Sequence, residues 1–565
     1  MRNELIVGVL AILIAFPLCI HDNFFASELL SDLPEFHHHR KAPVNGNNEG
    51  LQLLVLVEDS LYNDIIRELC CWVIEVGYQG FTVEIVTISA ASEPSEIRQL
   101  LQQYYAEGMV GCLLVGNLSA PLFKMPSDGS YEIFPIDLYF MDLDGVFYDL
   151  DVDGILDWHE GAKEPDIFLG RLYPSSLTGF GDSVSLLKKY FARNSLYRRG
   201  QLRLPQRVLT FVDDDWTGLA ATWHFQSTQV YSDGKLVNDP SETTASAYLD
   251  ELDEGYEFVL VGAHSNPLRH AFRVAGHWTY VESQDIFDKK PDVLFANLFA
   301  CSPADYRYTN HLAGAYLFAD SGPLALIASS KTGSMYDFLE FYSELAQGNG
   351  LGISLTSWLQ TAVYPSAEWP DSPHWVYGLT CFGDPVLPVA LNHSDPDNDN
   401  LPTYWENMFG LNPAIPDGTE DTDDDGLTNF EEFTLFTNPV NFDTEGDGMS
   451  DGWEHQYGLD VFSDDSQEDP DNDQLVNFDE FLWGTNPHSE DSDGDGLPDY
   501  TEIMLGTNPA NPDTDSDGLP DSHDFMPTVH WLLIVIPLAS ITSGALIVIT
   551  VRRRRKSQSV HEMNN

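Results

Sequence analysis

The chain has 565 residues, enough for two or three domains with a large core. Its formal charge of −62 argues against a nucleic-acid-binding function, because phosphates need a basic surface. The charge is uneven, since residues 394–530 contain 37 Asp and Glu but neither Lys nor Arg. These acids recur at fixed spacings between Trp, Phe and Leu, which favours a folded segment over a disordered acidic tail.

The chain begins with an apolar run, Leu5 to Ile20, of the length of a signal-peptide core. We therefore expect residues 1–27 to form a signal peptide and residues 28–50 a polar leader or linker. The same run also fits an uncleaved N-terminal anchor.

Between residues 51 and 391, short apolar runs alternate with amphipathic stretches. The runs predict strands at Leu51–Val57, Thr82–Ile88, Val110–Val115, Arg207–Val212, Glu257–Val261, Val293–Phe299 and Leu324–Ala328, and helices at Tyr62–Val76, Ile97–Tyr105 and Val184–Phe191. Such alternation is typical of an α/β fold with a mostly parallel sheet and helices on both faces. We expect two subdomains, 51–200 and 201–391.

The acidic segment, 394–528, is an internal repeat with units that begin every 22 or 26 residues. In the clearest unit, Asp491 to Glu502, oxygen ligands fall at positions 1, 3, 5, 9 and 12, and Gly496 stands at position 6. This is the register of a calcium loop, in which carboxylates surround a hard cation and glycine permits the turn. The candidate ligands are Asp395, Asp397, Asp399, Glu406, Asp421, Asp423, Asp425, Asn429, Glu432, Asp443, Glu445, Asp447, Asp451, Glu454, Asp469, Asp471, Asp473, Asn477, Glu480, Asp491, Asp493, Asp495, Asp499, Glu502, Asp513, Asp515, Asp517, Asp521 and Asp524.

Three of the six loops depart from this register. Asn400 and Gln474 replace the glycine, and Asp524 replaces the final glutamate, so we expect weaker binding there. The units are punctuated by Asn-Pro pairs and resemble thrombospondin type 3 repeats. The resemblance implies several structural calcium ions. Because unneutralised carboxylates repel one another, we expect a rigid stalk in millimolar calcium and an expanded one in chelator.

A seventh copy of the register lies before the repeats, at Asp149, Asp151, Asp153, Asp157 and Glu160, with Gly154 at position 6. A single copy also fits an acidic surface loop. The full match at every position predicts a calcium site here as well.

The C-terminal region contains a run without charge, Trp531 to Val551, followed by Arg552-Arg553-Arg554-Arg555-Lys556. This predicts a transmembrane helix over 530–551, a cytoplasmic tail over 552–565, and a cell-surface location for the bulk of the chain. A sorting signal that is cut and replaced by a lipid has the same layout.

Two predicted strands end in groups capable of catalysis. His264 follows the strand at 257–261, and Cys301 follows the strand at 293–299. Parallel neighbouring strands would bring both to one edge of the sheet, where a thiolate attacks a carbonyl and an imidazole moves the proton. The N–H groups of Ser265 and Cys301 are candidates for the oxyanion site. A structural His and a core Cys remain the alternative.

The pairing of His after one strand with Ala-Cys after the next resembles the caspase-like cysteine peptidases, and the gingipain family within them. The segments Pro135–Gly145, Pro165–Arg171 and Cys381–Pro385 carry the likeness over residues 51–391. The resemblance implies a caspase-like three-layer sandwich, His264 as base and acid, Cys301 as nucleophile, and Asp166 as a third member that orients His264.

The chain also departs from that family. Ser265 replaces the usual Gly after the histidine, and Gly179 stands where the family carries the acid that selects basic P1 residues. The expected function is a cell-surface cysteine endopeptidase acting on proteins or peptides. The alternatives are an inactive adhesion module and a transamidase of the same fold. The sequence leaves the oligomeric state open.

Overall fold

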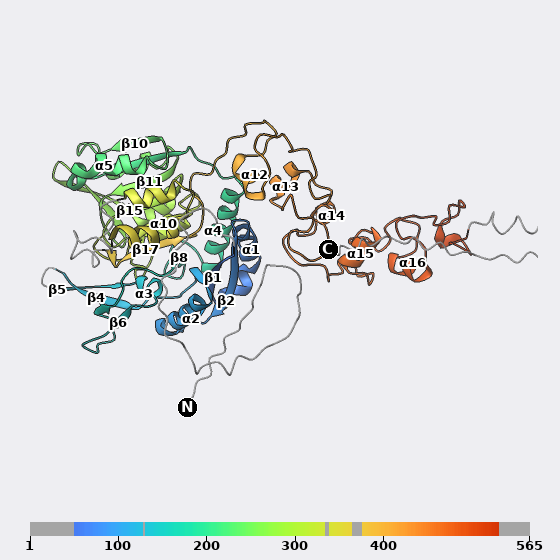
Figure 1. Cartoon of the computed structure of the whole chain (residues 1–565), viewed down its shortest axis with the longest axis horizontal. Coiled ribbons are helices and arrows are strands. Elements are labelled where there is room, and N and C mark those ends of the chain that lie inside the picture. Colours follow the sequence, from blue (N-terminus) through green and yellow to red (C-terminus); the bar gives the residue numbers. More distant parts are fainter. Residues whose placement is uncertain (1–49, 128–129, 334–337, 364–375, 530–565) are drawn as a thin grey trace, which may run out of the picture. The chain divides into compact units, whose positions relative to one another are not determined.

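The computed structural model describes residues 50–127, 130–333, 338–363 and 376–529 (Figure 1). These described residues divide into two compact units, 50–446 with Val461–Ser463, and Asp447–Asp460 with 464–529. The predicted signal peptide, most of the leader and the predicted transmembrane helix lie outside the described residues. Among them, no helix is long and apolar enough to cross a bilayer.

The first unit is mixed α/β and is built on a ten-stranded sheet with the order β10-β9-β11-β15-β16-β17-β8-β3-β1-β2. The strands are β1 (Leu51–Glu58), β2 (Phe81–Ile88), β3 (Met109–Val115), β8 (Phe168–Leu172), β9 (Arg207–Val212), β10 (Asp233–Val237), β11 (Tyr256–Gly262), β15 (Val293–Phe299), β16 (Ala325–Ser329) and β17 (Leu379–Gly383). Neighbours in this sheet are parallel except β16 and β17. That antiparallel contact separates two parallel halves of opposite direction.

Helices cover both faces of the sheet, because successive residues of each buried strand point to opposite faces. Leu53 and Val55 of β1 enter one core, whereas Leu54 and Leu56 enter the other. The first core is covered by α1 (Asp59–Gly77), α4 (Ser183–Arg198), α6 (Ala245–Glu251), α7 (Ser283–Lys289) and α8 (Leu312–Phe318). The second is covered mainly by α2 (Pro94–Glu107), α3 (Leu138–Met141), α5 (Thr217–Ser227), α9 (Leu339–Leu345) and α10 (Leu351–Trp358). Each face thus has its own hydrophobic core.

Three small antiparallel sheets accompany the main one. They are the hairpin β4 (Leu122–Ser127) with β5 (Ser130–Pro135), the pair β6 (Val146–Tyr148) with β7 (Trp158–Glu160), and the sheet β12 (His264–Asn266), β13 (Arg269–Val274) and β14 (His277–Glu282). The pair β6–β7 flanks the calcium loop predicted at Asp149–Glu160. This loop lies in the α/β part of the chain, residues 51–391, which is called the head below. The strand β12 carries His264.

Asp384, in the motif Cys381–Pro385, has a structural position. Its carboxylate is fully buried and accepts hydrogen bonds from Trp72 of α1 at 2.7 Å and from Arg198 of α4 at 2.6 Å. One buried carboxylate therefore joins these two helices, which cover the same face of the sheet.

The first two acidic repeats belong to the first unit and contribute α12 (Thr403–Phe409) and α13 (Asn429–Leu435). Arg199 connects them to the head: its Nε donates to Glu75 at 3.1 Å and its Nη1 to the carbonyl of Leu435 at 3.0 Å. Tyr78 packs edge-on against Phe409. The second unit contains α14 (Asp451–Tyr457), α15 (Asn477–Trp483) and α16 (Asp499–Leu505).

Candidate functional site

Three neighbouring strands, β9, β11 and β15, run parallel, and each is followed by a polar or nucleophilic side chain. Gly262 at the end of β11 pairs with Phe299 at the end of β15, and His264 and Cys301 each lie two residues further on. Asp215 lies in the short helix η1 (Asp214–Trp216) that follows β9. Parallel pairing thus brings the three residues to one edge of the sheet, with the histidine strand in the middle.

His264 is held on two sides. Its Nε2 lies 2.7 Å from Oδ2 of Asp215, and both side chains are partly exposed. Its ring lies 4.6 Å from that of Trp216 and 5.2 Å from that of Trp278. The Asp215 bond directs Nε2 toward the carboxylate and leaves Nδ1 as the nitrogen free to exchange a proton with a neighbour.

Cys301 is half-buried beside the segment that follows β16. Burial raises the pKa of its thiol, and the N–H of Gly333 and the ammonium of Lys331 offset part of that rise. Ser302 donates its N–H to the carbonyl of Lys331 at 3.0 Å. The resting thiol is therefore protonated and needs a base before it can act as a nucleophile.

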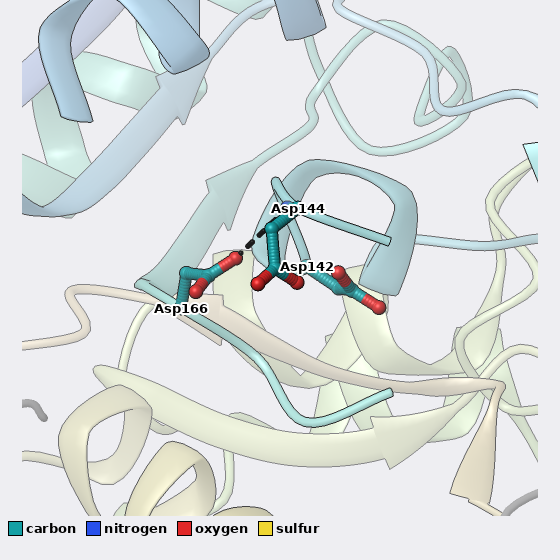
Figure 2. Close-up of side chains that lie close together, drawn as sticks. All are labelled: Asp142, Asp144 and Asp166. Atoms are coloured by element: carbon teal, nitrogen blue, oxygen red, sulfur yellow. Dashed lines mark hydrogen bonds between the residues drawn. The ribbon is translucent and has the colours of Figure 1, made fainter. Parts of the chain in front are cut away.

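Asp166, expected to orient His264, has other partners in the structure. It precedes β8, four strand positions from β11, which is about 19 Å at the usual strand spacing. Its Oδ2 accepts the N–H of Leu143 at 2.7 Å and that of Asp144 at 3.1 Å. Figure 2 shows Asp166 grouped with Asp142 and Asp144. The hydrogen-bond partner of His264 is therefore Asp215 and not Asp166.

Asp215 was not predicted, although the sequence contains a signal for it. Asp213, Asp214 and Asp215 directly follow the strand predicted at 207–212, and that strand lies next to the histidine strand. Ser265, a candidate oxyanion donor, lies in β12, and its hydroxyl bonds Nδ1 of His270 at 2.6 Å. The oxyanion roles of Ser265 and Cys301 stay predictions.

The acidic repeats share one loop conformation. In five of the six loops the N–H of position 6 donates to the carboxylate of position 1: Asn400 to Asp395 at 3.1 Å, Gly426 to Asp421 at 3.1 Å, Gln474 to Asp469 at 3.2 Å, Gly496 to Asp491 at 2.9 Å, and Gly518 to Asp513 at 2.8 Å. Asn400 and Gln474 adopt φ values of 75° and 88°. The two substitutions for glycine thus keep the loop, at the cost of a left-handed backbone.

The glutamate at position 12 turns inward in the repeats. A short helix begins at or near position 9, and its first turn buries Glu406, Glu480 and Glu502 completely. Neither carboxylate oxygen of these three residues has a hydrogen-bond partner within the described structure. Buried unpaired carboxylates are unstable unless a cation joins them, so these loops fit calcium.

Carboxylates of the loops also have partners outside their own loop. In the first repeat, oxygens of Asp399, Glu406 and Asp417 lie within 4.8 Å of one another. Asp417 lies outside the loop register and was not predicted as a ligand. In the second unit, the Asp495 carboxylate accepts the N–H of Ser522, 27 positions later, at 2.8 Å. Asp524 follows the last short helix and accepts the N–H of Met526 at 3.0 Å.

The boundary between the two compact units falls within the third repeat, after Gly446. Asp443 and Glu445 belong to the first unit, whereas Asp447, Asp451 and Glu454 belong to the second. In the first unit, Gly446 donates its N–H to Asp443 at 2.7 Å.

Comparison with protein families identifies the repeats. The model of the bacterial TSP3 repeat matches residues 443–458 and 491–512. The acidic segment contains calcium-binding TSP3 repeats. A search of the curated proteins returns no match for the chain.

The predicted calcium loop of the head differs from a TSP3 loop in its surroundings. The Nζ of Lys124 lies 2.5 Å from Asp151, 2.6 Å from Asp153 and 3.8 Å from Asp157. Glu160, at position 12, lies on the strand β7 and is exposed. Asp149, Asp151 and Asp157 still offer oxygens within 4.8 Å of one another. The chain thus supplies a cation to this loop.

Proposed function

We propose that the head is a cysteine endopeptidase of the caspase-like fold group, similar to the gingipains, displayed on a calcium-stabilised stalk. The observation that carries the proposal is the placement of Asp215, His264 and Cys301 after three adjacent parallel strands. A base held by a carboxylate at the same sheet edge as a thiol is an arrangement that nucleophilic acyl transfer can use.

The proposed mechanism assigns one task to each residue. Asp215 accepts a hydrogen bond from the Nε2–H of His264 and so fixes the tautomer in which Nδ1 is basic. His264 removes the Cys301 proton as the thiol attacks the substrate carbonyl, then gives that proton to the leaving amine. Water hydrolyses the resulting thioester with His264 again as base. Ser265 and Cys301 are proposed to donate N–H groups to the oxyanion.

Two alternative functions would use the same head differently. A transamidase would pass the thioester acyl group to an amine instead of water, and product analysis distinguishes the two. An inactive adhesion module would use the head for binding alone. The presence of both Cys301 and His264, with a partner for the latter, favours an enzyme.

We also propose a cell-surface location. The apolar run 531–551, the basic cluster after it and the N-terminal run support this location by sequence alone. Extracellular calcium in the millimolar range suits the TSP3 repeats. The membrane and protein or peptide substrates are then the partners.

The test is covalent labelling of the full-length protein, in calcium, with a panel of peptidyl chloromethyl ketones. Labelling is expected in the wild type and in Cys70→Ala, which removes another half-buried thiol, and is expected to vanish in Cys301→Ala. No labelling of the folded wild type would refute the peptidase and favour the adhesion module.

Asp215→Asn and Asp166→Asn separate the two carboxylates. Loss of a charged hydrogen bond to His264 is expected to slow labelling about tenfold in Asp215→Asn and to shift its pH profile. Asp166→Asn is expected to leave the pH profile unchanged. A shifted profile in Asp166→Asn alone would contradict the assigned geometry.

A further inference from the structure

The head loop, Asp149 to Glu160, has the backbone conformation of a TSP3 calcium loop. Three hydrogen bonds match those of the repeat at 491–502. They are Gly154 N to Asp149 at 2.8 Å against Gly496 N to Asp491 at 2.9 Å, Ile155 N to Asp153 at 2.9 Å against Leu497 N to Asp495 at 2.8 Å, and Leu150 N to Asp157 at 3.0 Å against Ser492 N to Asp499 at 2.9 Å. The two loops therefore hold the carboxylates at positions 1, 5 and 9 in the same way.

The head loop differs in having a cation of its own. Lys124 comes from β4, and its side chain is 8% exposed. Its ammonium lies 2.5 and 2.6 Å from Asp151 and Asp153, close to the 2.3–2.6 Å at which calcium binds oxygen. The ammonium donates hydrogen bonds to both carboxylates. Residues 394–530 contain no Lys or Arg to play this part in the repeats.

The head loop also lacks the inward glutamate. Position 12 of the repeat is Glu502, fully buried in the first turn of α16. Its counterpart Glu160 is exposed on a strand. A calcium loop without its bidentate ligand has less negative charge to offer a divalent ion, which suits a single ammonium.

We propose that Lys124 takes the place of a calcium ion in the head loop, so that the loop and the hairpin β4–β5 are held together without metal. Lys124 N donates to the carbonyl of Leu156 at 2.8 Å, and Leu156 N donates to that of Leu122 at 3.0 Å, which joins the loop to β4 along its backbone. The ammonium fixes the same contact through the side chain.

The hairpin extends from this loop to the Cys301 region. Glu132 of β5 accepts the N–H of Thr332 at 2.6 Å, and the neighbouring Lys331 accepts the N–H of Ser302 at 3.0 Å. The internal ammonium therefore holds one end of a connection whose other end positions the residues beside Cys301. The proposal concerns cation binding and does not depend on whether Cys301 is catalytic.

Bound calcium is counted on the full-length protein by equilibrium dialysis followed by elemental analysis. Asp153→Asn is expected to leave the number of bound ions unchanged, and the matched repeat variant Asp495→Asn to lower it. Lys124→Met frees the carboxylates and is expected to add one ion. Loss of an ion in Asp153→Asn with Lys124 intact would overturn the proposal.

Hydrogen exchange supplies a second readout in the same protein. In the wild type, chelator is expected to speed exchange in α16 and to leave β4 and residues 149–157 unchanged. In Lys124→Met, chelator is expected to speed exchange in β4 and the loop, and calcium to reverse the effect. Wild-type exchange in β4 and the loop that rises with chelator as strongly as in α16 would refute the substitution of lysine for calcium.

Discussion

The buried glutamate of the first repeat leads to a prediction whose sign depends on calcium. The perturbation is Glu406→Gln, which keeps the size of the side chain and removes its charge. Burial, followed by the charge of Asp397, raises the pKa of Glu406 to about 7, against 4.5 for an ordinary glutamate. The folded loop without metal therefore holds the ionised carboxylate at a cost, and the amide avoids this cost.

The magnitude follows from that rise in pKa. It corresponds to about 3 kcal/mol at pH 8, and solvent screening on the open side of the loop reduces it to about 1–2 kcal/mol. Carboxylate oxygens of Asp399 and Asp417 lie within 4.8 Å of a carboxylate oxygen of Glu406. Two unit negative charges at that separation repel by about 3 kcal/mol at an effective dielectric constant of 20. With calcium at a hundred times its Kd, a bound site gains about 2.7 kcal/mol, which the amide forfeits in large part.

The assay is hydrogen exchange of α12 in the full-length protein, which gives the free energy of local opening. Glu406→Gln is expected to raise that free energy in chelator and to lower it in calcium. Glu420→Gln, an exposed residue of the same region, is expected to change neither. A lower opening free energy in chelator, or no change in calcium, would refute the assignment of Glu406 as a ligand.

Two further predictions concern the repeats. Burial and the neighbouring aspartates raise the pKa values of Glu480 and Glu502 to about 8, so the folded state binds these protons more tightly than the unfolded state. In chelator the free energy of unfolding of the repeats is therefore expected to fall as the pH rises from about 4.5 to 8, measured by urea titration, and a rise over this range would contradict the assignment. Gln474→Gly removes a left-handed glutamine at φ 88° and is expected to stabilise the calcium-loaded fourth loop by about 1 kcal/mol. Gly496→Gln is the reverse control and is expected to destabilise the fifth loop. Hydrogen exchange of α15 and α16 measures the two effects.

Seven of the ten strands of the main sheet were predicted, and most of these are buried on both faces. Such strands are continuous apolar runs, and the predicted bounds 207–212 and 293–299 are those of β9 and β15. The strand β10 was missed because it is an edge strand with the polar start Asp233-Gly234-Lys235. The change of direction at β16 and β17 has no local signal, because strand direction depends on tertiary pairing.

The candidate site was predictable in part for a related reason. His264 and Cys301 follow recognisable strands, so their shared edge could be inferred from the chain order. The choice of carboxylate could not, because Asp166 and Asp215 both lie next to strands and only the sheet order separates them. Lys124 was missed because it lies 25 residues before the loop that it enters, on a strand of another sheet.

Arg199 has a mechanical consequence for a head carried on repeats. Its guanidinium donates hydrogen bonds to Glu75 in α1 and to the last residue of α13, and it lies over the aromatic rings of Phe436 and Phe462. A pulling force along the repeats would enter the head through this clamp as well as through the peptide after residue 391. The load would then enter α4, which Arg199 follows, and α1, which Asp384 joins to α4.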